Sequence, residues 1–227
     1  MEQSVFQPIV LTEWTETKQG GIALFTEQGF LFSVDWDTFV QFDLEHKIQK
    51  SSPLSSGELA LLERQSHKYK ARQWALRLVQ SKMYSQKQLQ DKLAQKYEAK
   101  DIEWAISEMN RIGYLDDFAY AQARVVALLR KNKSKNIILQ DLYQKGIAQE
   151  ITLQLLDELY QQQGEENGNQ LAIQNLLQKH YTRKLQQGKI QQVQAALARR
   201  GFGYAEIRQA IQQWTQDNPE DIEYPEE

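Results

Sequence analysis

The sequence predicts a mainly α-helical protein, in which a tandem array of three three-helix repeats follows a small N-terminal β-rich domain. Two observations predict the repeats. An apolar helical segment centres on a leucine three times, at Leu93, Leu142 and Leu197, which are 49 and 55 residues apart. The first core isoleucine of the next segment follows these leucines after 9, 9 and 10 residues. A third observation, the density of β-branched and aromatic residues before residue 35, predicts the β-rich domain.

The β-rich domain is expected to span residues 1–57. Residues 5–14, 21–25 and 30–34 favour three strands, and residues 26–29 between the last two are expected to form a four-residue hairpin loop. Asp35 can cap a short helix that covers the sheet, with Phe39, Val40 and Leu44 as the covering side chains. The polar segment 50–57 contains Pro and Gly, which is typical of a linker or a domain boundary.

The first helical repeat is expected at residues 58–115. Its first helix is expected at residues 68–83, with Ser85 as the cap of the second helix and Asp101 near the start of the third. The opposite face of the first helix carries polar residues at 70, 73, 77 and 80. Its apolar face has helical spacing and consists of Ala71, Trp74, Ala75, Leu78 and Val79.

The same pattern recurs in a second repeat, residues 116–163, and in a third, residues 164–216. In each, a glycine (Gly146 or Gly201) follows the second helical segment, where a left-handed residue commonly ends a helix. Units of this length bury a core partly against their neighbours, which is typical of tandem repeats. The acidic residues 217–227 form a tail, either a solvated end or a strip that shields the basic repeats until a partner displaces it.

A short junction separates the first repeat from the second. It contains Gly113, Tyr114, Leu115, Asp116 and Asp117. Gly113 can adopt the left-handed conformation that ends a helix, and Asp116 or Asp117 can cap the helix that follows. An acidic pair could also act as a metal ligand or an acid/base pair, but adjacent residues at a helix start do not face one another. We therefore expect a structural junction.

The sequence lacks the residue patterns of several kinds of catalytic and metal-binding site. The chain has no cysteine and only three histidines, His46, His67 and His180, without the spacing of metal ligands. It has no Gly-flanked serine nucleophile and no phosphate-cradling Gly-rich loop. The sequence therefore predicts no enzymatic activity, no metal and no cofactor. The first residues lack a signal-peptide pattern and no apolar run reaches 18 residues, so we expect a cytoplasmic monomer without a membrane span.

Charge is distributed unevenly along the chain. Residues 1–60 carry 3 basic and 9 acidic side chains, residues 61–215 carry 24 and 15, and residues 216–227 carry none and 6. A basic region between acidic ends favours an acidic protein or a nucleic acid as partner. Cations near helix C-termini also stabilise the helix dipole, which accounts for part of this pattern but not for four cations within residues 130–135. The candidate partner-binding residues are Lys70, Arg77, Arg130, Lys131, Lys133, Arg199, Arg200 and Arg208.

Three stretches resemble the RecX family of RecA recombinase modulators. They are residues 71–78 with 84–93, the junction 113–117 with Tyr120 and Ala121 and then residues 145–147, and residues 200–208. The resemblance implies a non-enzymatic regulator that lies in the groove of the RecA–DNA filament and restrains ATP hydrolysis, strand exchange and filament growth. Some family members also bind DNA directly. Family members often have Gly-Pro where this chain has Ser134-Lys135, which affects the turn beside the basic loop.

Two interpretations of the cations therefore remain open. They can contact the RecA filament, or they can serve an autonomous module that binds single- or double-stranded DNA. Few aromatic residues interleave the basic loop, so no stacking platform is evident there. The two interpretations differ in whether DNA affinity requires the recombinase.

Overall fold

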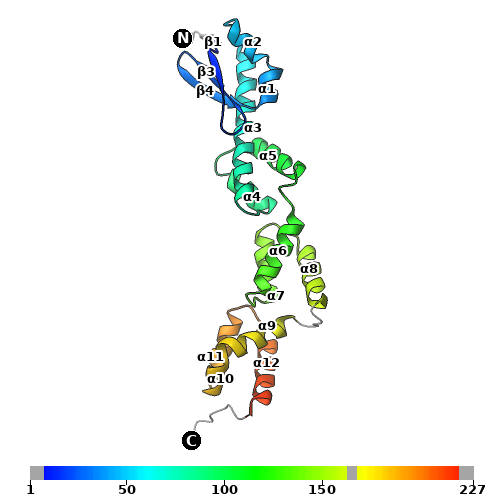
Figure 1. Ribbon diagram of the computed structural model, residues 1–227. Coiled ribbons are helices and arrows are strands. Elements are labelled where there is room, and N and C mark those ends of the chain that lie inside the picture. Colours follow the sequence, from blue (N-terminus) through cyan, green and yellow to red (C-terminus); the bar gives the residue numbers. More distant parts are fainter. Residues whose placement is uncertain (1–7, 163–167, 220–227) are drawn as a thin grey trace, which may run out of the picture. The chain divides into compact units, whose positions relative to one another are not determined.

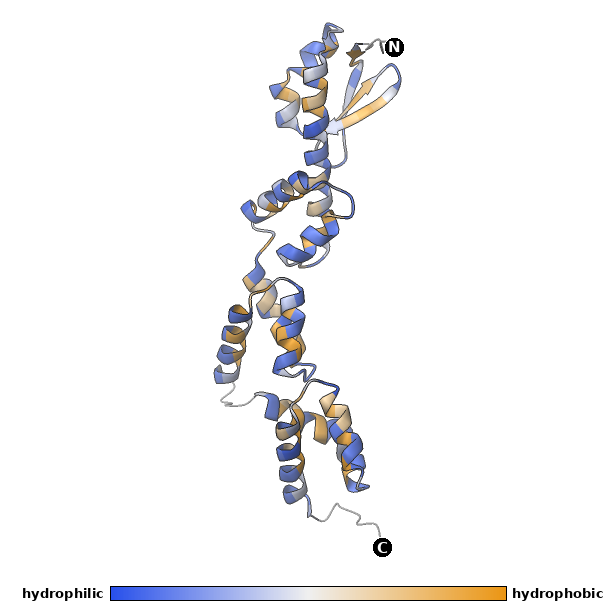
Figure 2. Cartoon of the chain, turned by 180° about the vertical axis from the view of Figure 1, so that it is seen from behind, coloured by the Kyte–Doolittle hydropathy of each residue, from blue (hydrophilic) through white to orange (hydrophobic). Residues whose placement is uncertain are grey.

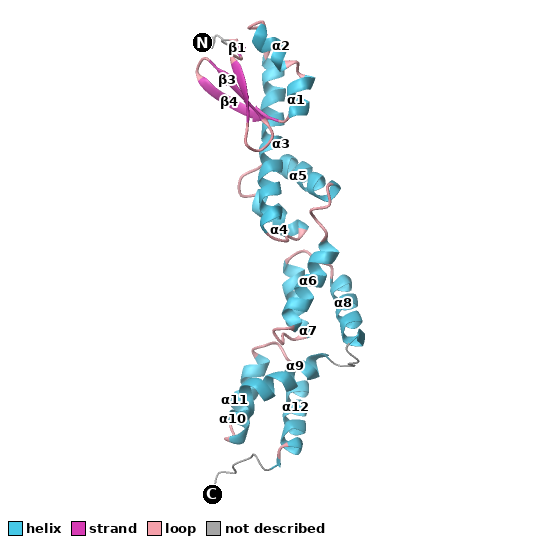
Figure 3. Ribbon diagram, viewed as in Figure 1, coloured by secondary structure: helices cyan, strands magenta, loops and turns pink. Residues whose placement is uncertain are grey.

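The computed structural model describes residues 8–162 and 168–219. The chain divides into two compact units, Met1–Leu115 and Asp116–Glu227 (Figure 1). Within the described residues the chain is mostly helical, with its strands confined to the first unit (Figure 3). This confirms the predicted fold class. Val5, where the first strand was expected to begin, and most of the acidic tail lie outside the described residues.

The first unit begins with two small antiparallel sheets. Strands β2 (Glu13–Glu16), β3 (Ile22–Thr26) and β4 (Gly29–Val34) form the expected meander, and β1 (Ile9–Val10) pairs with β5 (Pro53–Leu54). The predicted first strand is therefore interrupted. The hairpin between β3 and β4 is tighter than predicted, since Thr26 pairs with Gly29 and only two residues connect the strands. Gly29 has a φ of +108° at this turn, a conformation that suits glycine.

Two short helices cover the three-stranded sheet. Helix α1 (Trp36–Gln41) is capped by Asp35, whose carboxylate accepts a hydrogen bond from the Thr38 N–H at 2.7 Å, as predicted. Phe39 and Leu44, the latter at the start of α2 (Leu44–Gln49), are buried in the core of this sheet. Val40, also expected to cover the sheet, is 69% exposed, so that part of the prediction is wrong.

Residues 50–57 are not a linker, and the first helix starts well before the apolar face that was recognised from residue 68. The segment contains β5 and then Ser55, which forms a capping box with Glu58 at the start of α3 (Ser56–Ser81). This helix has 26 residues and continues from the sheet to the first helical repeat. Lys47 also contacts Glu58, at 2.8 Å, and these hydrogen bonds hold the Glu58 pKa at about 2.

The two halves of α3 bury opposite faces. Leu62 belongs to the core beneath the sheet, whereas Ala71 and Ala75 belong to the core of the first repeat. Leu62 and Ala71 are nine residues apart, and at about 100° per residue this places them about 180° apart around the helix. Ser66 and Tyr69 are buried between the two groups. In Figure 1 the same helix accordingly lies along β3 and β4 and then along α5.

The first repeat is completed by α4 (Gln86–Leu93) and α5 (Ala99–Arg111). Ser85 caps α4 through a capping box with Gln88, as predicted. Glu98 is the N-cap residue of α5, and Asp101 lies in its first turn, also as predicted. The core of this repeat is formed by apolar residues of all three helices, among them Leu89, Leu93, Ile106 and Met109.

The second unit contains two three-helix bundles. The first consists of α6 (Asp117–Leu129), α7 (Lys135–Gln144) and α8 (Gln149–Gln162), with Ile138 and Leu142 fully buried at its centre. In the second, α9 (Gly168–Leu176) continues through a π-helical turn (η1, Leu177–Tyr181) into α10 (Thr182–Gln186), and α11 (Ile190–Ala198) and α12 (Tyr204–Asp217) follow. Figure 2 shows the resulting mixture of apolar and hydrophilic residues around each helix.

A single backbone motif ends several of these helices. At Gly113, Gly146 and Gly201 the φ angle is positive, and the next N–H bonds the carbonyl five residues earlier. Ile147 thus donates to the Leu142 carbonyl at 3.1 Å, and Phe202 donates to the Leu197 carbonyl at 3.4 Å. This Schellman motif satisfies carbonyls that the helix leaves without partners. The repeated Leu-x-x-x-Gly-apolar spacing therefore has a structural cause.

Candidate binding surfaces

The junction after the first repeat has the predicted local geometry. Gly113 has a φ of +76° and follows α5, and its N–H donates to the Asn110 carbonyl at 3.0 Å. Asp116, rather than Asp117, is the N-cap of α6: its carboxylate accepts from the Ala119 N–H at 2.9 Å. Leu115 is buried and Tyr114 is 47% exposed. Capping thus accounts for Asp116 without any catalytic role.

The eight candidate cations fall into two groups, because two lie in the first unit and six in the second. Six are exposed, and Lys133 and Arg200 are partly buried. In the described parts of the chain, none of the eight forms a side-chain ion pair. Other cations do have partners; Lys145, for example, lies 3.1 Å from Asp141. The candidate residues therefore offer positive charge that carboxylates of the described residues do not neutralise.

In the first unit, Lys70 and Arg77 lie on one stretch of α3 beside Trp74. The Arg77 guanidinium lies 5.6 Å from the centre of a Trp74 ring, and the Lys96 ammonium lies 4.1 Å from it. Each such cation–π contact contributes on the order of 0.5–1 kcal/mol at an exposed site. Trp74 was predicted on the apolar face of this helix. It packs against the core of the first repeat, but its side chain is only partly buried. Lys96 was not among the predicted site residues.

In the second unit, Arg130, Lys131 and Lys133 lie in the loop between α6 and α7. Asn132 has a positive φ of 49° there, and the Lys133 N–H bonds the Leu128 carbonyl at 3.2 Å, so the loop is a closed turn. Ser134 then caps α7 and accepts from the Ile137 N–H at 3.3 Å. This N-cap defines the turn at Ser134-Lys135.

A partly buried ion pair fixes the helices on either side of this loop. The Arg124 guanidinium on α6 makes two hydrogen bonds to the Asp141 carboxylate on α7, at 2.8 and 2.9 Å. The Arg124 guanidinium, followed by the ammonium of Lys145, holds the pKa of Asp141 below its ordinary value. The nearby carboxylate of Asp141 is therefore engaged by Arg124 and Lys145 rather than by the loop cations.

The turn after Arg199 and Arg200 lies against the start of α7. A Cβ placed on Gly201 would lie 2.6 Å from both the Ser134 hydroxyl and the Ile137 side chain. Because α7 begins directly after the basic loop, two of the predicted basic segments meet at this contact between the second and third repeats. Arg208 is exposed on α12.

Asn169 links the same two repeats by hydrogen bonds. Its side-chain oxygen accepts from the Lys135 N–H at 2.8 Å, and its side-chain nitrogen donates to Glu206 at 3.0 Å. Glu206 in turn accepts from the Gly203 N–H at 3.0 Å, at the start of α12. The helix starts of α7 and α12 are therefore joined through a single side chain. Nothing in the local sequence pattern identifies Asn169 for this role.

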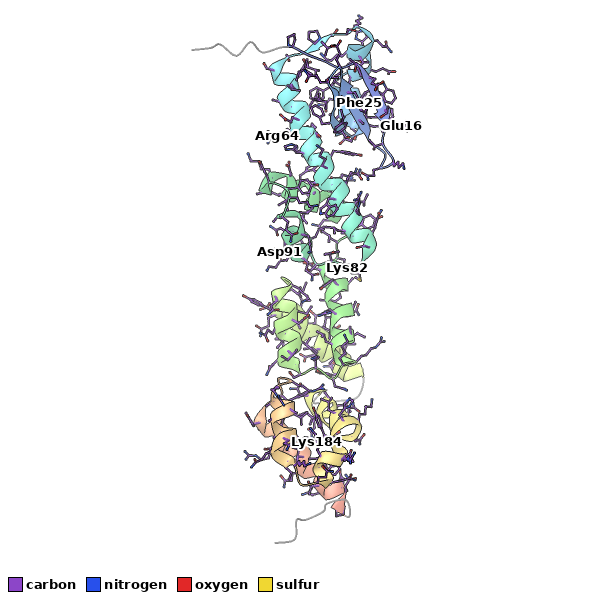
Figure 4. The ribbon with its side chains drawn as sticks, turned by 90° about the vertical axis from the view of Figure 1, so that its left-hand side faces the viewer. Glu16, Phe25, Arg64, Lys82, Asp91 and Lys184 are labelled. Carbon is purple, nitrogen blue, oxygen red and sulfur yellow. The ribbon has the colours of Figure 1, made fainter. Side chains whose placement is uncertain are left out.

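The third repeat has further cations that the prediction missed. Lys179, Arg183 and Lys184 are exposed on the π-helical turn and α10, with His180 beside them, and Figure 4 labels Lys184. The hydroxyl of Thr182 donates to the Leu177 and Gln178 carbonyls, at 3.1 and 3.0 Å, in this irregular turn. The sequence does contain a signal for this basic cluster. Lys179 and Arg183 are four residues apart, as are His180 and Lys184, and this spacing places each pair on one helical face.

The described residues contain no group of three or more His, Cys, Asp or Glu side chains that could hold a metal ion. Among the helices of residues 8–162 and 168–219, none combines the length and apolar character needed to cross a membrane.

Two family models match the helical repeats. Residues 71–109, which include much of the second half of α3, α4 and most of α5, match the model described as RecX, first three-helix domain. Residues 116–156, which include α6, α7 and much of α8, match RecX, second three-helix domain. Both matches lie where the structure has three-helix bundles.

Curated proteins and solved structures agree with these matches. The chain is 25% identical over 189 residues to "Regulatory protein RecX" of Caldanaerobacter subterraneus subsp. tengcongensis, covering 83% of this chain and 90% of that protein. It is 28% identical over 204 residues to the protein of the same name from Bacillus subtilis, covering 88% and 74%.

Two crystal structures have a similar fold. A regulatory protein RecX has a TM-score of 0.67 at 21% identity, covering 90% of this chain and 99% of that one. RecX from Lactobacillus salivarius has a TM-score of 0.53 at 22% identity, covering 65% and 96%.

Proposed function

The chain belongs to the RecX family, and we propose that it is a non-enzymatic regulator that binds the RecA–DNA filament and inhibits it. The relatives named above are regulatory proteins, which supports a regulatory role. The resemblance to the family adds the finer expectation that the chain restrains RecA ATP hydrolysis, strand exchange and filament growth.

The observation that carries this proposal is the set of cations without ion-pair partners on all three described helical repeats. Lys70 and Arg77 lie on the first, Lys131 and Lys133 precede the second helix of the second, and Arg199 ends the second helix of the third. A filament repeats the same surface on successive subunits, so an acidic patch on each subunit would meet the cations of several repeats. Weak contacts from several repeats would then add through the high effective concentration of linked sites.

We further propose that the junction at Gly113–Asp117 acts through geometry. Its residues end α5 and begin α6, so its backbone is the connection between the first repeat and the second. Its effect on binding would therefore be indirect, through the spacing of the cations on the two units.

Reversal of two cations in the basic loop tests the proposal. In a Lys131→Glu/Lys133→Glu variant, we expect co-sedimentation with RecA filaments to weaken at least tenfold and inhibition of the RecA ATPase to decrease in parallel. Lys50→Glu/Lys100→Glu is a matched control, because both lysines are exposed, lie outside the proposed surface, and give the same change in net charge. Circular dichroism of both variants checks that helicity is retained. Unchanged inhibition by the loop variant would refute the role of these residues.

An autonomous nucleic-acid-binding module is the second candidate function. Two cations on the Trp74 ring of α3, Arg77 from the same helix and Lys96 from the segment after α4, favour it specifically. The same sedimentation experiment with DNA alone separates the two functions, since a filament regulator requires the recombinase for its effect.

A further inference from the structure

An apolar patch, formed by Trp14, Trp36 and Val40, is exposed on the β-rich domain. Trp36 and Val40 are 41% and 69% exposed, and their spacing of four residues places them on one face of α1. The Trp36 ring contacts the Trp14 ring of β2 edge to face, with 5.8 Å between the ring centroids, and the buried Phe39 ring at 5.6 Å. The domain therefore holds the Trp36 ring in place while part of its surface faces solvent.

Two carboxylates border this patch. Asp37 follows Trp36 and lies three residues before Val40 on α1. Glu16 lies two residues from Trp14, on the same face of β2. Both carboxylates are exposed, and neither forms an ion pair with a described residue. Because an aromatic face and a carboxylate both attract cations, the patch suits lysine or arginine side chains, whose apolar stems can cover it.

The same chain uses a tryptophan in this way in its first repeat. There the Lys96 ammonium and the Arg77 guanidinium lie 4.1 and 5.6 Å from the centre of a Trp74 ring. No lysine or arginine of the described residues lies over the ring of Trp14 or Trp36. The apolar patch is therefore open to cations from outside its domain.

The third repeat carries the matching charge. Residues 168–219 contain 7 basic and 2 acidic side chains, whereas residues 8–57 contain 3 basic and 7 acidic ones. A basic cluster of Lys179, Arg183 and Lys184 is exposed on η1 and α10, and none of its members forms an ion pair with a described residue. Figure 4 labels Glu16 beside the patch and Lys184 of the cluster. The proposed function uses none of these side chains.

We propose that the apolar patch of one copy of this chain binds the basic cluster of a second copy. Complementary charge on two surfaces of the same chain favours a second copy as the occupant. A contact between unlike surfaces leaves one of each free, so it can continue from copy to copy. Single contacts of exposed cations are weak, so the monomer expected from the sequence persists in dilute solution. The inference is independent of the proposed function, because this pairing needs no recombinase.

Sedimentation velocity of the full chain tests the proposal. In low salt, the wild type should associate reversibly as its concentration rises from about 10 μM to about 1 mM, the range in which weak contacts form. Raising the salt to about 0.5 M should reverse the association, since exposed charges are then screened. Trp36→Leu keeps an apolar side chain but removes the ring, and should lower the association constant about fivefold through the loss of one cation–π contact.

Charge reversal on each surface tests the pairing directly. The Glu16→Lys/Asp37→Lys variant and the Lys179→Glu/Lys184→Glu variant should each associate at least tenfold more weakly than the wild type. An equimolar mixture of the two variants should associate again, because the intact patch of one then meets the intact cluster of the other. Circular dichroism checks that both variants retain their helicity.

Each reversal has a matched control. Glu27→Lys/Glu45→Lys changes two exposed carboxylates of the β-rich domain that lie outside the patch, so it should associate like the wild type. Lys131→Glu/Lys133→Glu changes the net charge as much as reversal of the cluster and should also associate like the wild type. Since this second control is the variant that tests filament binding, failure of the proposed function and failure of this inference are distinguishable.

Any of four results would overturn the proposal. The first is a wild type that stays monomeric in low salt at about 1 mM. The second is unchanged association of both reversed variants. The third is an equal loss of association in the controls, which would indicate net charge alone. The fourth is a sedimentation coefficient that depends on salt but not on concentration, which would make cations of the same chain the occupants of the patch.

Discussion

Two glycines of the third repeat allow the contact between the second and third repeats to be measured. Gly188 and Gly201 both follow helices and have positive φ angles, of 68° and 85°. A Cβ on Gly188 would meet nothing within 4 Å, whereas one on Gly201 would lie 2.6 Å from atoms of Ser134 and Ile137. Alanine at the two positions therefore imposes similar backbone strain but different contacts.

The structure gives the expected magnitudes. A Cβ at a left-handed position costs about 1–2 kcal/mol, partly offset by the lower entropy of the unfolded alanine chain. Gly188→Ala should therefore lower the free energy of unfolding by about 1 kcal/mol. Overpacking adds about 1–3 kcal/mol, so Gly201→Ala should cost about 2–4 kcal/mol. Urea unfolding followed by circular dichroism at 222 nm gives both values, provided that the denaturant slope m is unchanged.

A double-mutant cycle assigns the extra cost to the contact. Ile137→Ala removes one of the two groups that the new methyl would strike, so the cost of Gly201→Ala should decrease by at least about 0.5 kcal/mol in that background. Equal destabilisation by Gly188→Ala and Gly201→Ala, with no coupling to Ile137, would show that the two repeats do not meet in this way in solution.

Two further predictions concern buried polar groups. The Ser66 hydroxyl is buried and has no hydrogen-bond partner among the described residues. Ser66→Ala should therefore leave the free energy of unfolding unchanged or raise it by up to about 1 kcal/mol, as measured by thermal unfolding. A loss of more than about 1 kcal/mol would show that the hydroxyl does have a partner. The pKa of Asp141 is lowered in the folded state by Arg124 first, so its contribution is present above the unfolded pKa near 4 and is lost as pH falls below it. Asp141→Asn should cost about 1–2 kcal/mol at pH 7 and less at pH 3 in urea unfolding, whereas an equal cost at both pH values would contradict the linkage.

Local signals in the sequence were sufficient for much of the fold. Ser85 and Asp35 cap helices because their side chains satisfy N–H groups within three residues, and that relation can be read without tertiary structure. Gly113 and Gly201 end helices for an equally local reason, the positive φ that each adopts. The apolar periodicity around Leu142 reflects one face packed into one core.

The prediction failed where the role of a residue depends on contacts with residues far away in the sequence. The start of α3 was missed because Leu62 and Ala71 face different cores, so the helix has no single apolar stripe. Lys96 gained its importance only when folding placed it on Trp74, which is 22 positions earlier in the chain. Asn169 likewise bonds Lys135 across 34 residues. Such contacts depend on tertiary packing that periodicity does not encode.

The continuity of α3 limits where the chain can be truncated without exposing apolar side chains. A cut at residue 57 leaves a helix whose Leu59 and Leu62 have lost the sheet that covers them. The remaining repeat would expose these apolar side chains to solvent and would tend to aggregate. A shorter relative that lacked the β-rich domain would need polar residues at these two positions. The sheet and the first repeat therefore depend on each other through α3, which contributes to both cores.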